Sequence, residues 1–294
     1  MKNNLFAVTV ALAALAVSAP VANAADAAPA MLWEATGFAG PESALLDVKS
    51  GVIYVSNVNG DAMAKDGNGF IAKVSMDGKT VDTKWSTGLN GPKGLAISDG
   101  HLFTGDIDEL VEINLADGKI VAKHAAPGAK LLNDVVADGK GNVYVSDTGG
   151  GGVYKLSGGK IEKWVDAPEL AGANGLILEG GNLIVNTWGV LTGKGFETSS
   201  LGRMLSVSLA DKKITALDGG KPVGNLDGLA SLGGGNYLIG DWMAGKFSKF
   251  AADGKVTTLL EPGQGTADFA YDPATKIVYI PQMMKNTLTA YKMP

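Results

Sequence analysis

The sequence predicts an all-β protein, a six-bladed β-propeller with four antiparallel strands in each blade. One pattern recurs six times along the chain at a spacing of about 41 residues, lengthened in the first and fourth copies. Each copy holds short runs of β-branched and aromatic residues separated by turn residues, and the 42 glycines fit many short strands and tight turns. Helical patterning is almost absent. Four strands at this period describe a propeller blade rather than a sandwich.

The first strand of each blade is predicted from the opening of each copy. These openings are PESALLD from Pro41, GPKGLAI from Gly91, LNDVVAD from Leu132, GANGLIL from Gly172, NLDGLAS from Asn225 and TADFAYD from Thr266. A second apolar run follows each opening, as in GVIYVSN and GNVYVSD. These second runs predict the second strands.

The third and fourth strands are predicted from alternation and from a repeated turn. Third runs such as GFIAKVS alternate apolar and polar residues, which indicates strands with one solvated face. The segments MDGKT, ADGKI, SGGKI, ADKKI and ADGKV then recur at one point of five copies. Asp-Gly and Gly-Gly supply the positive φ angles that tight hairpins require.

The ring is predicted to close through both ends of the chain. The sixth copy ends at Pro294 after its third strand, and the segment MLWEATGF (31–38) resembles the fourth strands of other copies. We expect this segment to complete the last blade, because closure removes the exposed sheet edge.

Residues 1–24 have the pattern of a cleavable signal peptide: a basic start, a short apolar run and the small-residue site Ala22-Asn23-Ala24. The prediction is export to the periplasm or secretion, with 25–294 as one propeller domain. There is no cysteine, and the net charge of −5 is spread without a basic stripe. We therefore expect a monomer that binds no nucleic acid and whose mature chain inserts in no membrane.

Four of the six openings carry an oxygen-bearing side chain at the same phase: Glu42, Asn133, Asn174 and Asp227. First strands line the channel of a propeller, so a closed ring brings these residues together at one mouth. Two carboxylates and two amide oxygens suit a hard divalent cation, and calcium more than magnesium, because magnesium demands a near-octahedral cage. Zinc is disfavoured, since no His or Cys lies at this phase.

Three other charged residues lie at or near this phase. Lys93 either holds a substrate carboxylate or stabilises an oxyanion, or it forms a charge pair with Glu42 or Asp268. Asp134 and Asp268 are predicted to support the cage from behind. For Asp134, a capped turn is the equally favoured alternative.

Two long insertions, 58–68 and 189–200, fall between the second and third strands of their blades. These loops lie on the same face as the starts of the first strands, so we expect them to wall the mouth. His101 and His124 fall on a second and a fourth strand, away from the mouth, and no role is assigned to them.

With these motifs the chain resembles the senescence-marker protein/gluconolactonase (regucalcin-type) family, and is similar in plan to paraoxonases and the squid phosphotriesterase. The resemblance spans the predicted mature chain. It implies a catalytic calcium held by Glu42 in GPESALLD, Asn133 in LNDVVAD, Asn174 in GANGLIL and Asp227 in NLDGLAS. The chain departs from the gluconolactonase pattern at Leu131, where that family often carries a substrate-contacting Arg, and it lacks the His pair of paraoxonases.

The sequence therefore predicts a calcium-dependent hydrolase of lactones or related esters, acting on a small-molecule substrate. Asp227 is the expected general base or nucleophile as well as a ligand, with Lys93 near the developing negative charge. The alternative is a non-catalytic propeller that binds a small ligand or a partner protein at the same mouth. Phosphotriester hydrolysis is a third reading that shares the metal and differs in substrate.

Overall fold

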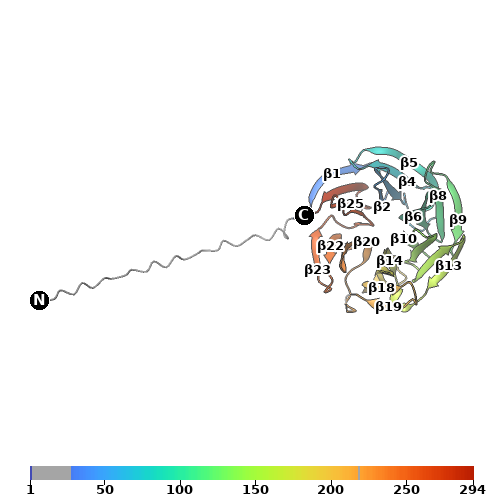
Figure 1. Cartoon of the computed structure of the whole chain (residues 1–294). Helices are drawn as coiled ribbons and strands as arrows, with labels where there is room; N and C mark the ends of the chain where they lie inside the picture. The colour runs from blue at the N-terminus through green and yellow to red at the C-terminus, as the bar shows by residue number, and fades with distance from the viewer. Residues whose placement is uncertain (2–27, 218) are drawn as a thin grey trace.

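A computed structural model describes residues 1, 28–217 and 219–294. Six four-stranded antiparallel sheets form a closed ring around a central channel, as Figure 1 shows. The predicted fold class is confirmed. The predicted signal peptide lies almost wholly outside the described residues and stays a prediction. Within the described residues, no helix is long and apolar enough to cross a membrane.

The first three blades follow one another along the chain in the predicted order. Their strands are β2 (Pro41–Asp47), β3 (Val52–Asn57), β4 (Gly69–Ser75) and β5 (Thr80–Leu89); β6 (Pro92–Ser98), β7 (His101–Asp106), β8 (Glu109–Asn114) and β9 (Ile120–Ala125); β10 (Leu132–Ala137), β11 (Asn142–Asp147), β12 (Val153–Ser157) and β13 (Lys160–Val165). A short 3-10 turn, η2 (Pro168–Leu170), leads to the fourth blade.

The last three blades include a separate hairpin in the second insertion and the N-terminal strand that completes the ring. Their strands are β14 (Ala173–Glu179), β15 (Asn182–Thr187), β18 (Met204–Ser208) and β19 (Ile214–Ala216); β20 (Leu226–Gly233), β21 (Asn236–Asp241), β22 (Lys246–Phe250) and β23 (Val256–Leu260); β24 (Ala270–Asp272), β25 (Ile277–Gln282), β26 (Thr287–Lys292) and β1 (Ala30–Thr36). Strands β16 (Gly189–Leu191) and β17 (Thr198–Leu201) form a separate hairpin inside the second insertion.

The ring is closed at its outer and inner edges. Strand β1 pairs with β26, with Ala35 opposite Leu288, so the N-terminal strand completes the sixth blade as predicted. At the channel, Asp268 N donates to Glu42 O (3.0 Å) and Ala44 N donates to Asp268 O (3.2 Å). The first and last blades are therefore hydrogen-bonded to each other at the site where function is expected.

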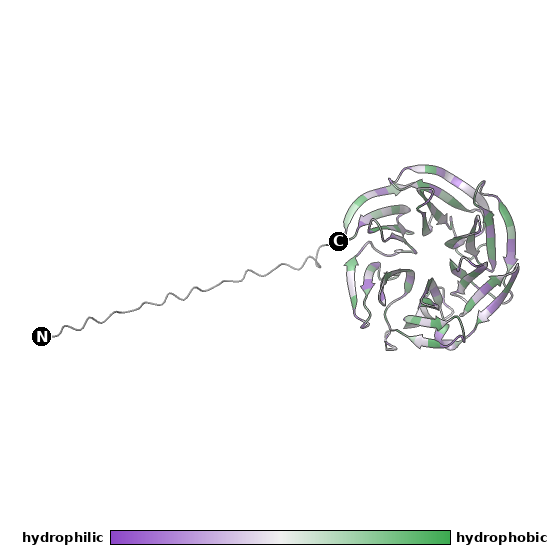
Figure 2. Ribbon diagram, in the orientation of Figure 1, coloured by the Kyte–Doolittle hydropathy of each residue, from purple (hydrophilic) through white to green (hydrophobic). Residues whose placement is uncertain are grey.

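The core is divided among the blade interfaces. Buried apolar side chains form a cluster between each pair of neighbouring blades, including the pair that closes the ring. Hydrophobic and hydrophilic residues alternate along the strands in Figure 2. Each blade buries its faces against its neighbours. Because the chain has no cysteine to form disulfides, apolar packing between blades stabilises the propeller.

The repeated hairpin turns have the backbone that their residues predicted. Gly78, Gly118 and Gly254 have φ angles of 86°, 72° and 81°. In the fourth blade, where the turn reads ADKKI, Lys212 takes the same left-handed conformation with φ 62°. The turn geometry is thus kept even where glycine is absent.

Candidate metal and substrate site

The four residues of the shared phase converge on one cavity at the mouth of the channel. Glu42 (β2), Asn133 (β10), Asn174 (β14) and Asp227 (β20) all line it, together with Lys93 from β6. The cavity has a volume of about 200 Å³. All five side chains are buried. The structure therefore brings the predicted ligands together as the ring requires.

A β-bulge aims each of these side chains. The pairing of the first with the second strand slips at one point in five blades: Pro41/Ser43, Pro92/Leu95, Leu132/Val135, Ala173/Leu176 and Leu226/Leu229. Each slip spans one of the five polar residues. A bulge takes a residue out of the regular ladder and redirects its side chain. The common phase in the sequence is thus a common bulge in the structure.

Polar residues of the second strand hold three of these bulges in place. Ser56 Oγ accepts from Ser43 N (2.9 Å), Ser146 Oγ accepts from Asp134 N (3.0 Å) and Asn186 Oδ1 accepts from Gly175 N (2.8 Å). These bonds satisfy N–H groups that the disrupted ladder leaves free. Sequence reasoning missed this role. The signal was present, because Ser56, Ser146 and Asn186 share one position of the second runs VIYVSN, NVYVSD and NLIVNT.

Glycine after a polar residue marks close strand packing here, not a turn. Gly94, Gly175 and Gly228 follow Lys93, Asn174 and Asp227, and none has a positive φ. A Cβ on Gly94 would lie 2.5 Å from Asp134 Cα, and one on Gly228 would lie 2.6 Å from Phe269 Cδ1. Small residues at this phase therefore let neighbouring first strands approach one another around the narrow channel.

The amide groups at the site are oriented with their oxygens free. Asn133 Nδ2 donates to Thr148 Oγ1 (3.1 Å), and Asn174 Nδ2 donates to Leu226 O (3.1 Å) and to Asp227 Oδ1 (3.2 Å). Asn133 Oδ1, Asn174 Oδ1 and Glu42 Oε2 are buried without a hydrogen-bond partner among the described residues. Buried oxygens in a folded protein are nearly always paired. Three unpaired acceptors at one cavity are therefore available to bind a cation or a hydrogen-bond donor.

Lys93 lies within the same cavity and is held by the loop that precedes its strand. Its Nζ donates to Gly91 O (2.6 Å). Burial lowers the pKa of Lys93, and the neighbouring Glu42 carboxylate opposes that effect. No ion pair within 4.0 Å joins Lys93 to a described carboxylate. The ammonium group is thus close enough to act on the cavity without being neutralised by direct contact.

Asp134 and Asp268 lie toward the other end of the channel. Both line a second cavity of about 510 Å³ rather than the first. Asp268 Oδ2 accepts from Ser43 Oγ (2.6 Å), and Asp134 Oδ1 is buried without a partner. Neither side chain hydrogen-bonds a predicted ligand side chain, although the Asp268 backbone supports Glu42.

The acids of the channel are held in an environment that disfavours their charge. Burial, and then repulsion by Asp227, raises the pKa of Glu42 well above its ordinary value. Burial, and then repulsion by Asp268, likewise raises the pKa of Asp227 and of Asp134. Burial raises the pKa of Asp268 to about 7. The channel concentrates acidic groups, and the buried Lys93 partly offsets the raised pKa of Glu42 and of Asp227.

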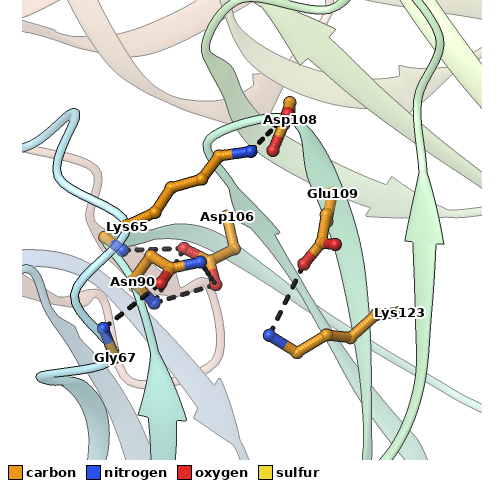
Figure 3. Close-up of polar contacts among 8 residues, drawn as sticks. Lys65, Gly67, Asn90, Asp106, Asp108, Glu109 and Lys123 are labelled. Carbon is orange, nitrogen blue, oxygen red and sulfur yellow. Dashed lines mark hydrogen bonds and ion pairs between the residues drawn. The ribbon is translucent and has the colours of Figure 1, made fainter.

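The two insertions reach the mouth, as expected. Ala62 of the first and Phe196 of the second line the cavity. Figure 3 shows the first insertion against the second blade, where Lys65 Nζ contacts Asp108 Oδ2 (2.6 Å) and Gly67 N donates to Asn90 Oδ1 (3.2 Å). Asn90 N donates in turn to Asp106 Oδ2 (2.9 Å).

Apart from the polar residues described above, the wall of the mouth cavity is mostly apolar, and sequence reasoning did not identify all of the apolar residues that form it. Trp188 and Trp242, each directly after the second strand of its blade, line the cavity. The others are Leu131, Phe196, Met283 and Met284. Met283 and Met284 follow the second strand of the sixth blade, as Trp188 and Trp242 follow theirs. That shared position was the available signal.

The two histidines have a separate setting. His101 Nδ1 and His124 Nε2 both contact the Glu112 carboxylate, at 3.1 and 3.0 Å. They lie on β7 and β9 and do not line the mouth cavity. Among the residues that the structure describes, no three His, Cys, Asp or Glu side chains form a metal-binding group. Any metal at the mouth would depend on the amide oxygens as well as on Glu42 and Asp227.

Comparisons with known proteins show similarity in fold. No protein-family model and no curated protein matches the chain. Among solved structures, a candidate gluconolactonase is 18% identical over 91% of this chain and 92% of its own, with a TM-score of 0.63. A gluconolactonase from Xanthomonas campestris is 15% identical over 91% of this chain and 88% of its own, with a TM-score of 0.62.

Virginiamycin B lyase from Staphylococcus aureus, solved as an inactive variant with quinupristin, is 12% identical over 87% of this chain and 95% of its own, with a TM-score of 0.59. The fold therefore defines a six-bladed propeller similar to gluconolactonase-like proteins, as the motifs indicated. Similar folds also include a lyase, so the reaction has to be argued from the site.

Proposed function

We propose that the chain is a calcium-dependent hydrolase of lactones or related esters, with the ion held at the mouth of the channel. The observation that carries this proposal is the set of unpaired buried oxygens Glu42 Oε2, Asn133 Oδ1 and Asn174 Oδ1 facing one cavity beside Asp227. Oxygen ligands with a total charge of −2 suit calcium, which takes six to eight of them. Four protein side chains leave positions for water and substrate.

The site also offers groups for the chemical step. A bound calcium ion supplies a Lewis acid that polarises a carbonyl oxygen. Asp227 accepts from Asn174 at Oδ1, while its Oδ2 has no hydrogen bond within the described part of the chain, and that oxygen is the proposed base. It takes a proton from water while the water oxygen bonds to the carbonyl carbon; the ring C–O bond then breaks and the leaving oxygen takes up the proton. Lys93 lies where negative charge develops.

The experiment is a panel of lactones and a phosphotriester, assayed with calcium and with chelator. Hydrolysis that stops on chelation and returns with calcium supports the proposal. Asp227→Ala should lower kcat about 10³-fold, whereas the control Glu261→Ala, an exposed acid that does not line the cavity, should not change it. Turnover indifferent to chelator and to Asp227→Ala would remove the mechanism. Magnesium in place of calcium tests the choice of ion.

The rival function, a non-catalytic propeller, is favoured by one observation. Leu131 is buried in the cavity wall, where gluconolactonase-type relatives often place a substrate-binding Arg. Calorimetry separates the two functions: calcium and a lactone that bind with no turnover of any ester in the panel would establish a binding protein. If the phosphotriester is the only compound hydrolysed, the proposed site is supported and the reaction is phosphotriester hydrolysis rather than lactone hydrolysis.

A further inference from the structure

The wall above the polar floor of the mouth cavity is built from apolar side chains. Trp188, Trp242 and Met283 follow the second strands of three blades, Phe196 comes from the second insertion, and Leu131 precedes β10. The Trp188 ring lies 5.9 Å from that of Trp242 and 5.8 Å from that of Phe196, centroid to centroid. Three aromatic rings in tilted contact form one continuous face.

Trp188, the central ring of this face, is held by hydrogen bonds within the protein. Trp188 N donates to Gly172 O (2.6 Å), and Asn225 Nδ2 donates to Trp188 O (2.8 Å). Trp188 Nε1 donates to Phe196 O (3.0 Å), which also ties the second insertion to the rim. The indole N–H is thereby used within the protein and is not free for a ligand hydroxyl.

Of the two other polar side-chain groups in the wall, the Thr148 hydroxyl is occupied, whereas the Trp242 indole N–H has no hydrogen-bond partner among the described residues. Thr148 Oγ1 donates to Ala173 O (2.8 Å) and accepts from Asn133 Nδ2 (3.1 Å). Leu131 offers only methyl groups. Hydrogen bonds for a ligand are therefore concentrated at the floor, on Glu42, Lys93 and the predicted metal ligands. A ligand that is polar at one end and apolar over most of the rest fits this arrangement.

We propose that the cavity selects lactones or esters with an apolar alkyl or aryl substituent over polyhydroxylated sugar lactones. The reaction named here rests on the proposed function, but the preference rests on the cavity wall. A hydroxyl placed against this wall away from the Trp242 indole N–H loses its water without gaining a partner, which weakens binding about tenfold or more. Each methylene buried there strengthens binding about fourfold. Exposed Met63 and Met243 directly follow the lining residues Ala62 and Trp242 in the chain, and exposed Met284 itself lines the cavity.

The first experiment compares γ-butyrolactone, γ-hexalactone, γ-octalactone and glucono-δ-lactone as substrates. We expect kcat/KM to rise along the alkyl series until the substituent fills the cavity of about 200 Å³, and to be at least tenfold higher for γ-octalactone than for glucono-δ-lactone. Glucono-δ-lactone turned over as well as γ-octalactone would overturn the inference and leave the proposed function intact.

Two variants test the wall itself. Trp242→Ala and Phe196→Ala, at a half-buried and an exposed position, should lower kcat/KM for γ-octalactone about tenfold and for γ-butyrolactone less than twofold. The control is Leu201→Ala, an exposed apolar residue of the same insertion hairpin that does not line this cavity. Equal losses for both lactones in the two wall variants would contradict the proposal.

A binding measurement keeps the inference testable if no ester is hydrolysed. Trp188 and Trp242 line the cavity, so ligand entry should change tryptophan fluorescence. In Asp227→Asn without metal, γ-octalactone should shift the emission at concentrations at least tenfold below those of glucono-δ-lactone, and Trp242→Phe should reduce the signal. If no ester is hydrolysed but γ-octalactone still binds more tightly than glucono-δ-lactone, the proposed hydrolase function is wrong and the apolar binding site is supported. If both lactones change the fluorescence at the same concentrations, the inferred preference for apolar substituents is wrong.

Discussion

The two ends of the central channel are built from the same six first strands, yet they differ in chemistry. At the mouth, the starts of the strands present Glu42, Asn133, Asn174 and Asp227 below an aromatic wall, in a cavity of about 200 Å³. At the far end, the later residues of the same strands surround a cavity of about 510 Å³. There the side chains are mainly apolar, with the carboxylates of Asp134, Asp268 and Asp272 among them.

The difference follows from where the ladder is broken. Bulges occur at the mouth end of the first strand in five blades, while the pairing beyond them is regular until β20 nears its end. Both long insertions also lie at the mouth. In a regularly paired strand, side chains point alternately to the two faces of the sheet. A bulge breaks this alternation and lets a residue direct a polar side chain into the channel. The function is therefore expected at the mouth.

The largest expected effect is on calcium affinity, which should depend on residues at the mouth and not on residues at the far end of the channel. Asn174→Ala removes an unpaired oxygen from the mouth, and it should weaken calcium binding by about 100-fold, since even outer-shell changes cost 10–100-fold. Ser231→Ala, in the lining of the far cavity, should leave the affinity unchanged. Isothermal titration calorimetry measures both. Equal affinity in the two variants would place the ion elsewhere.

The close approach of first strands can be broken by adding volume. Gly228→Val places a Cβ 2.6 Å from Phe269 Cδ1 and 2.9 Å from Asp268 Cα. Overpacking of this kind should lower the free energy of unfolding by about 3 kcal/mol. Urea denaturation measures the change, with Ser231→Ala on the same strand as the control. A variant as stable as the parent would show that the channel can widen.

The support of the bulges can be tested at Ser146, which is fully buried. Ser146→Ala leaves Asp134 N without its acceptor and should lower the free energy of unfolding by about 1 to 2 kcal/mol. Calcium affinity should fall with it, because Asn133 lies in the same bulge. Ser248→Ala is the matched control, a buried serine with no hydrogen bond among the described residues. Loss of stability with unchanged calcium affinity would separate the bulge from the site.

The smallest effect is expected for the ion pair that holds the first insertion. The Lys65 and Asp108 side chains are 54% and 37% exposed, so the pair is screened by water and salt. Lys65→Met should leave the midpoint of urea denaturation nearly unchanged. Hydrogen exchange of residues 60–68 should rise, and Lys79→Met, in another exposed pair, should not alter it. Unchanged exchange would show that the backbone contacts suffice.

The repeated pattern made the blade count, the closing strand and the hairpin turns predictable, because each is written locally in every copy. The convergence of Glu42, Asn133, Asn174 and Asp227 was also predictable once the ring was assumed. An Asn-Gly pair locally favours a turn, yet Gly175 after Asn174 packs against the neighbouring strand. That contact joins residues of different blades and has no local signature.

By itself, the sequence determined the six blades and the phase at which polar residues line the channel, since both follow from a repeat of about 41 residues. Only the tertiary structure decided which oxygens stay unpaired, that Asp134 and Asp268 face the far cavity, and that Leu131, Phe196 and Met283 complete the mouth wall. The physical reason is that periodicity fixes the face a strand buries, whereas bulges and contacts between blades fix where each side chain points.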